Sequence, residues 1–321
     1  MSPDDSVFAR LTRAAFLYAL SQWRSLEGLR WAQCGVLQLA RDEKERRSQE
    51  RSLQALALPP EYAQFRDAEG GLWFPGAGWI RPRSLVAAML ARCGEKLEAR
   101  FGQEVAALEY LNGNWNAKNL KGKTIESAPV VVLANAADAL RLAPQKAVRL
   151  RRVRGQLSLI PPIAELGHVV LRGGMVLPAV DGVSVVGASY DLGDEDPAPR
   201  AESHAGNLER LEQMLPGASG GLDPAKLEGR VAFRAVVPDR LPMIGAVSDA
   251  RGPGLYGAFA YGSRGLLWAG LGGELLASLI EGEPLPVEKK LAAALDPGRF
   301  ALRAARRRGN AALSRATSAP A

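Results

Sequence analysis

The hydrophobic and polar positions divide this chain into helical and extended segments. Helices are predicted where apolar residues recur at helical spacing, which occurs over residues 4–23, 85–101 and 202–215. Strands are predicted where short apolar or alternating runs occur, over residues 33–39, 105–115, 125–135, 148–160, 229–235 and 255–260. Two further runs within residues 165–190, joined by Val180-Asp181-Gly182, predict an antiparallel hairpin. This mixture indicates an α/β chain with a β-rich middle.

Residues 127–136 (SAPVVVLANA) are the most continuous apolar run outside the helices. The run is rich in β-branched residues and ends in small ones. Such a pattern is typical of a parallel strand buried on both faces. We therefore predict that this segment is the central strand of a sheet.

Residues 254–283 combine a strand, a glycine turn and a long apolar helix. Residues 255–260 read as a buried strand, and Gly262-Ser263-Arg264-Gly265 leads into the helix. Glycines there allow a ligand to approach the backbone, Ser263 can cap the helix, and the first N–H groups of a helix favour negative charge. The segment suits a nucleotide or a reduced flavin ring. A glycine turn selected only for packing is the alternative.

Composition and charge narrow the class of protein. The chain has 321 residues, 47% of them hydrophobic, which is enough for a large core. A formal net charge of +7 is compatible with a polyanionic partner without requiring one. Cys34 and Cys93 are the only cysteines, which excludes a disulfide framework and a cysteine-rich zinc site.

The two ends of the chain and one internal segment carry the charge patterns. The first twenty residues resemble no signal peptide and no run reaches transmembrane length, so we expect a cytosolic protein with no membrane association. Residues 41–51 are highly charged and are interpreted as a solvated helix, with a nucleic-acid patch as the alternative. The basic residues 301–321 are expected to form a disordered tail.

Several separate motifs, taken in order, resemble one family. They are residues 34–39 (CGVLQL), 78–82 (GWIRP), 130–135 (VVVLAN), 154–156 (RGQ), 186–190 (VGASY), 239–245 (DRLPMIG), 262–265 (GSRG) and 295–300 (LDPGRF). Their order and spacing resemble the FAD-dependent half of the MnmC family of bifunctional tRNA 5-methylaminomethyl-2-thiouridine biosynthesis enzymes. That family lies within the flavoproteins similar to D-amino-acid oxidase and glycine oxidase. The resemblance covers about residues 4–303.

The resemblance implies a fold and a reaction. The fold would be α/β (α+β), an incomplete FAD-binding Rossmann-like domain interleaved with an antiparallel-sheet substrate domain. The cofactor domain would comprise residues 1–32, 78–147 and 236–300, and the substrate domain mainly residues 33–77 and 148–235. In the family, FAD-dependent oxidation removes the carboxymethyl group of 5-carboxymethylaminomethyl-(2-thio)uridine at the tRNA wobble position. The products are glyoxylate and 5-aminomethyl-uridine.

The resemblance also implies roles for individual residues. Arg234 lies five residues before Asp239, where related oxidases place the arginine that binds the substrate carboxylate; Arg264 would be a second catalytic, substrate-facing group. Both are expected to bind substrate, as are Tyr190 and Trp79, although Trp79 has packing as an alternative. The expected contacts to FAD come from two segments, namely Ala134 and Asn135 in one and Gly262, Ser263, Gly265 and Leu266 in the other.

Two departures from the family pattern leave alternatives open. Met175 stands where relatives usually have a tyrosine, and the 321 residues contain no G-x-G-x-x-G motif to bind the FAD pyrophosphate. The resemblance implies tRNA as a partner. The missing motif adds a further possibility, a separate chain that supplies the dinucleotide-binding unit or the methyltransferase domain. The alternatives are a small-molecule glycine or amine oxidase and a remnant without FAD activity.

Overall fold

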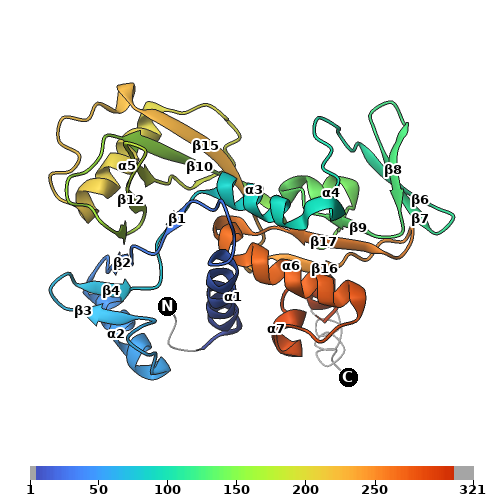
Figure 1. Ribbon diagram of the computed structural model, residues 1–321, viewed down its shortest axis with the longest axis horizontal. Helices are drawn as coiled ribbons and strands as arrows, with labels where there is room; N and C mark the ends of the chain where they lie inside the picture. Colours follow the sequence, from blue (N-terminus) through green and yellow to red (C-terminus); the bar gives the residue numbers. More distant parts are fainter. Residues whose placement is uncertain (1–4, 307–321) are drawn as a thin grey trace, which may run out of the picture. The chain divides into compact units, whose positions relative to one another are not determined.

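The computed structural model describes residues 5–306, which form two compact units (Figure 1). The first unit comprises Met1–Arg10, Trp23–Leu97 and Val153–Phe233, and the second comprises Leu11–Gln22, Glu98–Arg152 and Arg234–Ala321. At the start of helix α1 (Val7–Trp23), the Ala9 N–H donates to Ser6 Oγ and so caps the helix. No described helix is long and apolar enough to cross a membrane.

The first unit is built on a largely antiparallel sheet. Its strand order is β14-β10-β13-β12-β11-β2-β4-β3, and β15 also pairs with β10. The bounds are β2 Val36–Leu39, β3 Gln64–Arg66, β4 Gly71–Phe74, β10 Arg151–Ile160, β11 Val169–Leu171, β12 Met175–Val180, β13 Val183–Gly187, β14 Asp191–Leu192 and β15 Glu228–Val236. Only β11 and β2 pair in parallel among the described pairs of this sheet.

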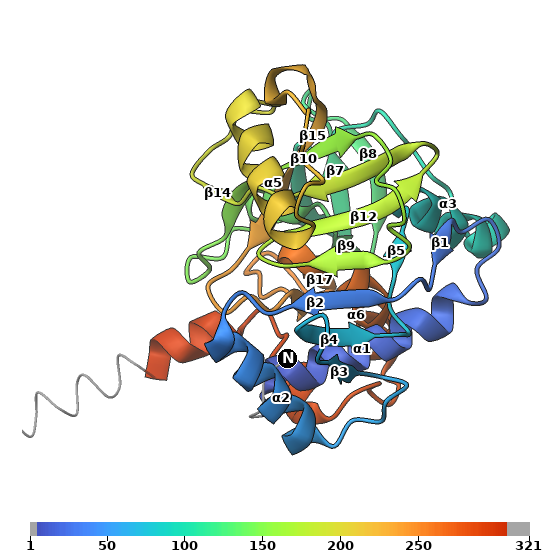
Figure 2. The ribbon, with the colours of Figure 1, turned by 90° about the vertical axis from the view of Figure 1, so that its left-hand side faces the viewer.

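Helices cover parts of this sheet. Helix α5 (Ala201–Met214) packs on β12 and β13, and Figure 2 shows it lying across these strands. Its inward face, which includes Leu208 and Leu211, joins Val176 and Val186 in one hydrophobic cluster. Helix α2 (Glu43–Leu56) packs on β3 and β4 and carries i,i+4 ion pairs such as Arg47 with Glu43. The prediction of a solvated helix over residues 41–51 is thereby confirmed.

The remaining short elements of the first unit are a two-stranded ribbon and three helical segments. Strands β1 (Trp31–Ala32) and β5 (Trp79–Ile80) pair in antiparallel fashion. The helical segments are α3 (Pro82–Cys93), η1 (Gly94–Lys96) and η3 (Pro224–Lys226). The predicted hairpin is confirmed, because β12 and β13 are joined by Asp181 and Gly182, both at positive φ.

The second unit contains two three-stranded sheets. One has the order β16-β17-β9, with β16 at Met243–Ala246, β17 at Leu255–Phe259 and β9 at Val131–Leu133. The other is the antiparallel β6-β7-β8, with β6 at Ala107–Leu111, β7 at Asn114–Lys118 and β8 at Thr124–Ala128. The helices are η2 (Ala136–Asp138), α4 (Ala139–Leu142), η4 (Gly262–Arg264), α6 (Gly265–Glu281) and α7 (Lys289–Ala293). Residues 299–306 are also helical.

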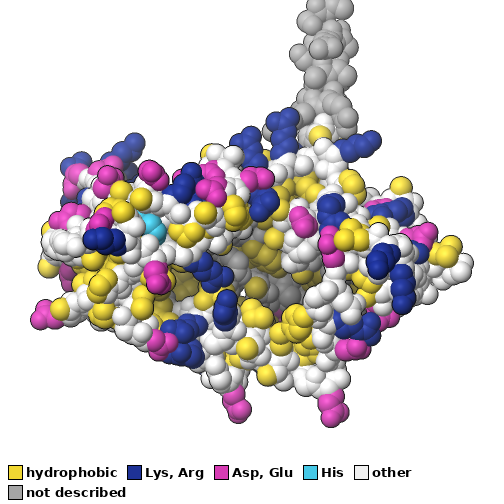
Figure 3. Space-filling model, turned by 90° about the horizontal axis from the view of Figure 1, so that it is seen from above, with side chains coloured by type: hydrophobic (Ala, Val, Ile, Leu, Met, Phe, Trp, Pro, Cys, Tyr) yellow, Lys and Arg dark blue, Asp and Glu magenta, His cyan; other side chains and the backbone are white. Residues whose placement is uncertain are grey.

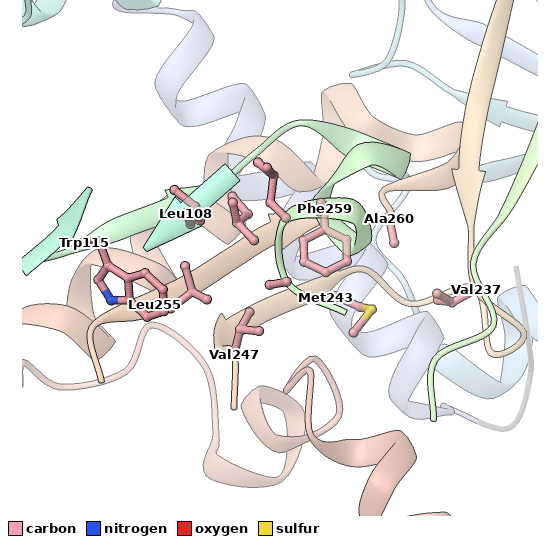
Figure 4. Packing of buried hydrophobic residues seen from close by; sticks show 12 residues of the cluster. Leu108, Trp115, Val237, Met243, Val247, Leu255, Phe259 and Ala260 are labelled. Carbon is pink, nitrogen blue, oxygen red and sulfur yellow. The ribbon is translucent and has the colours of Figure 1, made fainter. Parts of the chain in front are cut away.

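The core of the second unit runs along β17. Figure 4 shows Trp115 beside Leu255 at one end of that strand, and Phe259 with Met243 and Ala260 toward the other. Trp115 is fully buried, and its indole N–H donates to the carbonyl oxygen of Pro253 at 2.6 Å. Helix α6 packs on β16 and β17 and covers one face of this sheet.

Three predictions about elements are wrong. Residues 127–136 are not one central strand: β8 pairs in antiparallel fashion with β7, and only β9 is parallel to β17. Within the described chain β9 is an edge strand, and Val130 and Val132 are 39% and 41% exposed rather than buried on both faces. The helix predicted over residues 85–101 ends at Cys93, because Gly94 adopts positive φ and terminates it.

The third error concerns the basic end of the chain. Residues 301–306 continue a helix rather than a disordered tail, and this helix is held by ion pairs described below. The rest of the predicted tail, residues 307–321, lies outside the described residues. The assignment of segments to a cofactor domain and a substrate domain stays a prediction.

Candidate active site

The parallel pair β9 and β17 brings two predicted cofactor-binding segments to one edge of a sheet. Val131 is paired with Leu255 and Leu133 with Gly257, so both strands end on the same side. Ala134 and Asn135 directly follow β9, and the turn at Gly262 directly follows β17. Ligands in α/β folds characteristically bind at the carboxyl ends of parallel strands. The structure therefore places these two segments together, as the sequence predicted.

The turn after β17 is shaped by positive φ angles. Ala260 has φ 61° and Gly262 has φ 58°, after which η4 leads into α6. The N-cap position of α6 is occupied by Arg264, and no described side chain there makes a capping hydrogen bond. The prediction that Ser263 caps the helix is therefore wrong. The inserted 3₁₀ turn shifts the start of the helix past Ser263. Ser263 lies exposed in that turn, followed by Gly265 and the exposed Leu266.

The start of α6 and the tyrosine beside it define the electrostatics of the turn. The first N–H groups of a helix have no partner within the helix and carry the positive end of its dipole, which favours a ligand that gains negative charge. Burial raises the pKa of Tyr261 to about 12, so its hydroxyl stays protonated at neutral pH. Gly272 in α6 leaves room for this tyrosine, because a Cβ there would lie 3.0 Å from the Tyr261 oxygen. That glycine therefore serves packing.

Arg234 lies near the end of β15, and the two residues after it approach the Gly262 turn. A Cβ built on Gly262 would lie 3.8 Å from Val236 Cγ2 and 4.0 Å from the Ala235 carbonyl oxygen. The two residues that follow Arg234 therefore lie against the Gly262 turn, and Arg234 itself is partly buried. The guanidinium is a planar fork that matches a carboxylate with two parallel hydrogen bonds. The position suits a substrate that is held beside a ligand at the turn.

Two further arginines, Arg240 and Arg264, affect each other electrostatically near the turn. Partial burial of the guanidinium and the positive charge of Arg240 lower the pKa of Arg264 from its ordinary value. Arg240 is exposed and has φ 59°, a backbone conformation that non-glycine residues seldom adopt. Like charges placed this close repel each other, and a bound anion would relieve that repulsion. Sequence reasoning assigned no role to Arg240, because its nearness to Arg264 is not visible along the chain.

Trp79, a predicted substrate residue, lies in the first unit. It belongs to β5 and pairs with Ala32 of β1. A Cβ on the preceding Gly78 would lie 1.8 Å from the Ala32 carbonyl oxygen, so this glycine is required for the two short strands to approach. The glycines before Trp79 thus have a packing role.

Tyr190, the other predicted residue of the first unit, is 52% exposed and stands beside a buried polar network. Arg154 is the centre of the network and is fully buried. Its guanidinium donates to the carbonyl oxygens of Asp196 at 2.8 Å and Ala198 at 2.5 Å and to Gln156 Oε1 at 2.9 Å, and contacts Asp191 Oδ2 at 3.3 Å. Arg154 lies within four consecutive buried residues of β10, and the loop after β14 supplies the carbonyl partners of its guanidinium.

Most of the predicted site lies in one unit. Arg234, Arg264 and the six predicted cofactor residues belong to the second unit, whereas Trp79 and Tyr190 belong to the first. Sequence reasoning missed Arg240 and the network around Arg154. The turn, the positive helix end and the arginines fit the ring portion of a flavin, which gains negative charge on reduction. No residues for the pyrophosphate portion follow from the motif pattern.

Comparison with known proteins agrees with this geometry. Residues 2–279 match the family model described as FAD dependent oxidoreductase (DAO). The chain is 45% identical over 347 residues to the tRNA 5-methylaminomethyl-2-thiouridine biosynthesis bifunctional protein MnmC of Paraburkholderia phytofirmans, covering 95% of this chain and 53% of the relative. The MnmC protein of Cupriavidus necator is 43% identical over 351 residues, with 95% and 53% covered. The chain therefore spans about half the length of these relatives.

Solved structures show the same fold. Glycine oxidase from Geobacillus kaustophilus superposes with a TM-score of 0.73 at 21% identity, covering 91% of this chain and 83% of that one. L-proline dehydrogenase from P. horikoshii gives a TM-score of 0.74 at 20% identity, with 92% and 84% covered. The predicted mixed α/β fold, with parallel and antiparallel sheets, is confirmed. This chain belongs to the FAD-dependent oxidoreductase (DAO) family and matches the oxidase portion of MnmC.

Proposed function

We propose that this chain carries the flavin-ring and substrate-carboxylate portions of a tRNA-modifying oxidase. Its substrate is 5-carboxymethylaminomethyl-(2-thio)uridine at the wobble position, and its products are glyoxylate and 5-aminomethyl-uridine. The observation that carries the proposal is the contact between the end of β15, just after Arg234, and the turn at Gly262. The similarity to MnmC proteins supports tRNA as the substrate.

Each part of the site has a physical role in this proposal. The substrate side chain is an N-substituted glycine, and Arg234 binds its carboxylate through two charge-assisted hydrogen bonds. Arg264 faces the same carboxylate, and its closeness to Arg240 makes this end of the site strongly attractive to an anion. The start of α6, beginning at Gly265, stabilises negative charge near the turn. Bound FAD would supply the hydride acceptor for the two-electron oxidation of the glycine-like carbon, and water would then hydrolyse the oxidised C=N bond to glyoxylate and the primary amine.

The remaining site residues have supporting roles. Ala134, Asn135, Gly262, Ser263 and Leu266 would lie along the ring through backbone and small side chains, which allows close approach. Tyr190 and Trp79 would contact the uridine portion of the substrate through their aromatic rings.

The free edge of β9 supports a further part of the proposal. No other described strand pairs with that edge, and Val130 and Val132 are exposed, although parallel strands are normally buried on both faces. We propose that a polypeptide segment outside these 321 residues, in the same or a separate chain, supplies the pyrophosphate-binding unit and pairs there. The methyltransferase activity would likewise reside outside these residues. A tRNA substrate places the protein in the cytoplasm.

The decisive experiment measures glyoxylate release from tRNA that carries the carboxymethylaminomethyl group, in parallel with the visible spectrum of bound flavin. Arg234→Ala should lower kcat/KM by about 10²–10⁴-fold, because two hydrogen bonds to a charged group are lost. The flavin spectrum should be retained. Arg234→Lys should recover part of the loss, since it keeps the charge but not the fork.

Three outcomes would contradict the proposal. Absence of flavin absorbance after addition of FAD and the supplying segment would exclude the oxidase. Turnover of free glycine or sarcosine in preference to tRNA would favour a small-molecule oxidase. Full activity of Arg234→Ala would exclude this arginine as the carboxylate ligand.

A further inference from the structure

A basic groove lies in the second unit near the last described residues. Its volume is about 710 Å³, and Arg149, Asp239, Phe300 and Arg303 line it together with small residues. Three segments that are far apart in the sequence meet here. Asp239 lies shortly before β16, whose first residue, Met243, pairs with Phe259 at the end of β17. The groove therefore opens at the same end of the sheet as the Gly262 turn.

The charge of the groove is positive and only partly balanced. Residues 147–152 and 299–306 contain six arginines (149, 151, 152, 299, 303 and 306) and no acidic residue. Asp239 accepts from Arg299 Nε at 2.9 Å and Nη2 at 3.1 Å, and from Arg303 Nη1 at 2.6 Å. Burial by itself would raise the pKa of Asp239, but these two arginines hold it below its usual value. One carboxylate thus faces two guanidinium groups.

The two arginines on Asp239 differ in what remains available to a ligand. Arg299 is 4% exposed, and it also donates to the carbonyl oxygens of Leu241 at 2.8 Å and Leu295 at 3.1 Å. It is a structural group. Arg303 is 47% exposed and uses one nitrogen on Asp239. It also lines the groove.

Arg149 completes the cationic lining. It is exposed, and within residues 5–306 it has no hydrogen bond or ion pair. Its positive charge is therefore unbalanced by any described acid. The groove offers two guanidinium groups, those of Arg149 and Arg303, to a negatively charged ligand.

Phe300 adds an aromatic surface. The ring packs against the core of the second unit on one side and lines the groove on another. The Cζ atoms of Arg299 and Arg303 lie 4.5 Å and 5.5 Å from its centroid, so cations fix its orientation. An aromatic ring beside paired guanidinium groups is the combination that binds single-stranded RNA, with phosphates on the arginines and a base on the ring.

A second basic surface shows a different arrangement. The hollow along α2 in the first unit is lined by Glu43, Lys44, Arg47, Glu50 and Arg51 among others, so acidic residues lie among its basic ones, and Arg47 is paired with Glu43. It has no aromatic lining residue. Figure 3 shows Lys and Arg side chains around the last described residues, and elsewhere on that face they alternate with Asp and Glu. The groove at Phe300 is therefore the better anion site.

We propose that the groove at Arg149, Phe300 and Arg303 binds the tRNA substrate, with phosphates on the two arginines and a nucleoside base on the phenyl ring. The inference rests on the proposed function, which makes tRNA the substrate, and it adds the surface by which the RNA is held. It also gives a role to the cluster of Asp239, Arg299 and Arg303 at this end of the sheet. The groove would hold the RNA while one uridine lies beside the Gly262 turn.

The test measures the affinity of the purified protein for tRNA as a function of salt concentration. Each phosphate contact contributes about 0.7–0.9 to the slope of log affinity against log salt. The double variant Arg149→Ala/Arg303→Ala should therefore reduce the slope by about 1.4–1.8 and weaken binding at least about tenfold at 0.1 M salt. Phe300→Leu should weaken binding by about five- to a hundredfold with an unchanged slope, because it removes stacking but no charge.

The matched control is Lys121→Ala/Lys123→Ala, which removes the same charge from the exposed turn between β7 and β8 in the same unit. Its slope should stay that of the unmodified protein. The proposal that the groove binds tRNA would be contradicted by any of three results. These are an unchanged slope in the Arg149 and Arg303 variant, an equal loss of slope in the lysine control, or no tRNA binding at all. Arg149→Ala alone, at an exposed position, keeps the test valid if the double variant folds poorly.

Glyoxylate release separates this inference from the proposed function. Arginine-dependent tRNA binding without oxidation would contradict the oxidase and leave the groove in place. If the protein oxidises modified tRNA but substitution of Arg149 and Arg303 leaves its tRNA affinity unchanged, only the proposal that the groove binds tRNA would be contradicted.

Discussion

Two arginine-centred regions, one in each unit, use the same side chain in opposite ways. In the first unit Arg154 is fully buried, and carbonyl, amide and carboxylate oxygens surround its guanidinium. In the second unit Arg240 and Arg264 lie near each other at an exposed turn, and the charge of one lowers the pKa of the other. The first arrangement provides hydrogen-bond acceptors for the buried guanidinium of Arg154, whereas the second concentrates positive charge at Arg240 and Arg264.

This difference separates an arginine enclosed by protein partners from arginines that raise the positive potential of a surface. Removing a cation from water costs several kcal/mol, so a buried arginine persists only when the protein provides its partners. Arginines close together at a surface repel each other, and a nearby negative charge lowers that repulsion. Sites with such perturbed charges are therefore candidates for function. The comparison predicts that substitutions in the first region reduce stability and those in the second reduce activity.

The largest expected effect is on stability and comes from Arg154→Met. The substitution removes the guanidinium donor from the carbonyl oxygens of Asp196 and Ala198 and leaves Asp191, among described side chains, with only the Ser189 hydroxyl, and removing one partner of a buried network costs about 3–5 kcal/mol. Urea unfolding monitored by tryptophan fluorescence measures this loss. Arg151→Met, on the exposed start of the same strand, is the control and should leave the unfolding midpoint nearly unchanged. Equal effects of the two substitutions would contradict the comparison.

The next effect is on activity and comes from Arg264→Ala. Loss of one charge-assisted hydrogen bond to the carboxylate should reduce kcat/KM by about 10–100-fold. The unfolding midpoint should not fall, because the substitution also removes the repulsion from Arg240. Steady-state glyoxylate assays and urea unfolding measure the two quantities on the same preparation. A marked loss of stability would show that Arg264 is structural, like Arg154.

The smallest expected effect is a pH dependence in the first unit. Ser158 Oγ lies 2.7 Å from His204 Nδ1 and accepts from the amide of Asn207 at 3.0 Å, and the tautomer of the imidazole sets which of the serine and the histidine donates. Burial lowers the pKa of His204 below its ordinary value of 6.5. The unfolded chain therefore binds the proton more readily, and the stabilisation is complete above pH 6.5 and falls as the pH drops toward the folded pKa.

Unfolding free energies measured between pH 5 and pH 8 check this dependence. His204→Gln should flatten the profile, although it lowers stability at every pH because the side chain is buried. A profile in the variant that is as steep as in the unmodified protein would assign the pH dependence to other groups.

The chain's local patterns predicted most helices and strands, and they predicted the strand and glycine turn that precede α6. The helical spacing over residues 202–215 corresponds to α5, and the Asp181-Gly182 turn corresponds to the hairpin of β12 and β13. The motifs at residues 130–135 and 262–265 follow neighbouring parallel strands, β9 and β17, and so lie at one edge of the sheet; their contact with a cofactor stays a prediction. Local patterns failed at 127–136, where an apolar run looks the same whether its strand lies at the centre or at the edge of a sheet.

By itself the sequence determined the alternation of helices and strands, the glycine turn before α6, the arginine five residues before Asp239 and the net positive charge. These follow from residue spacing and composition. Only the tertiary structure decided that Arg154 is buried, that the charge of Arg240 acts on Arg264, that the end of β15 approaches Gly262, and that Arg149 and Arg303 share a groove. The reason is physical: an arginine's role depends on its solvation and on the charges around it, and both are set by segments that are distant in sequence.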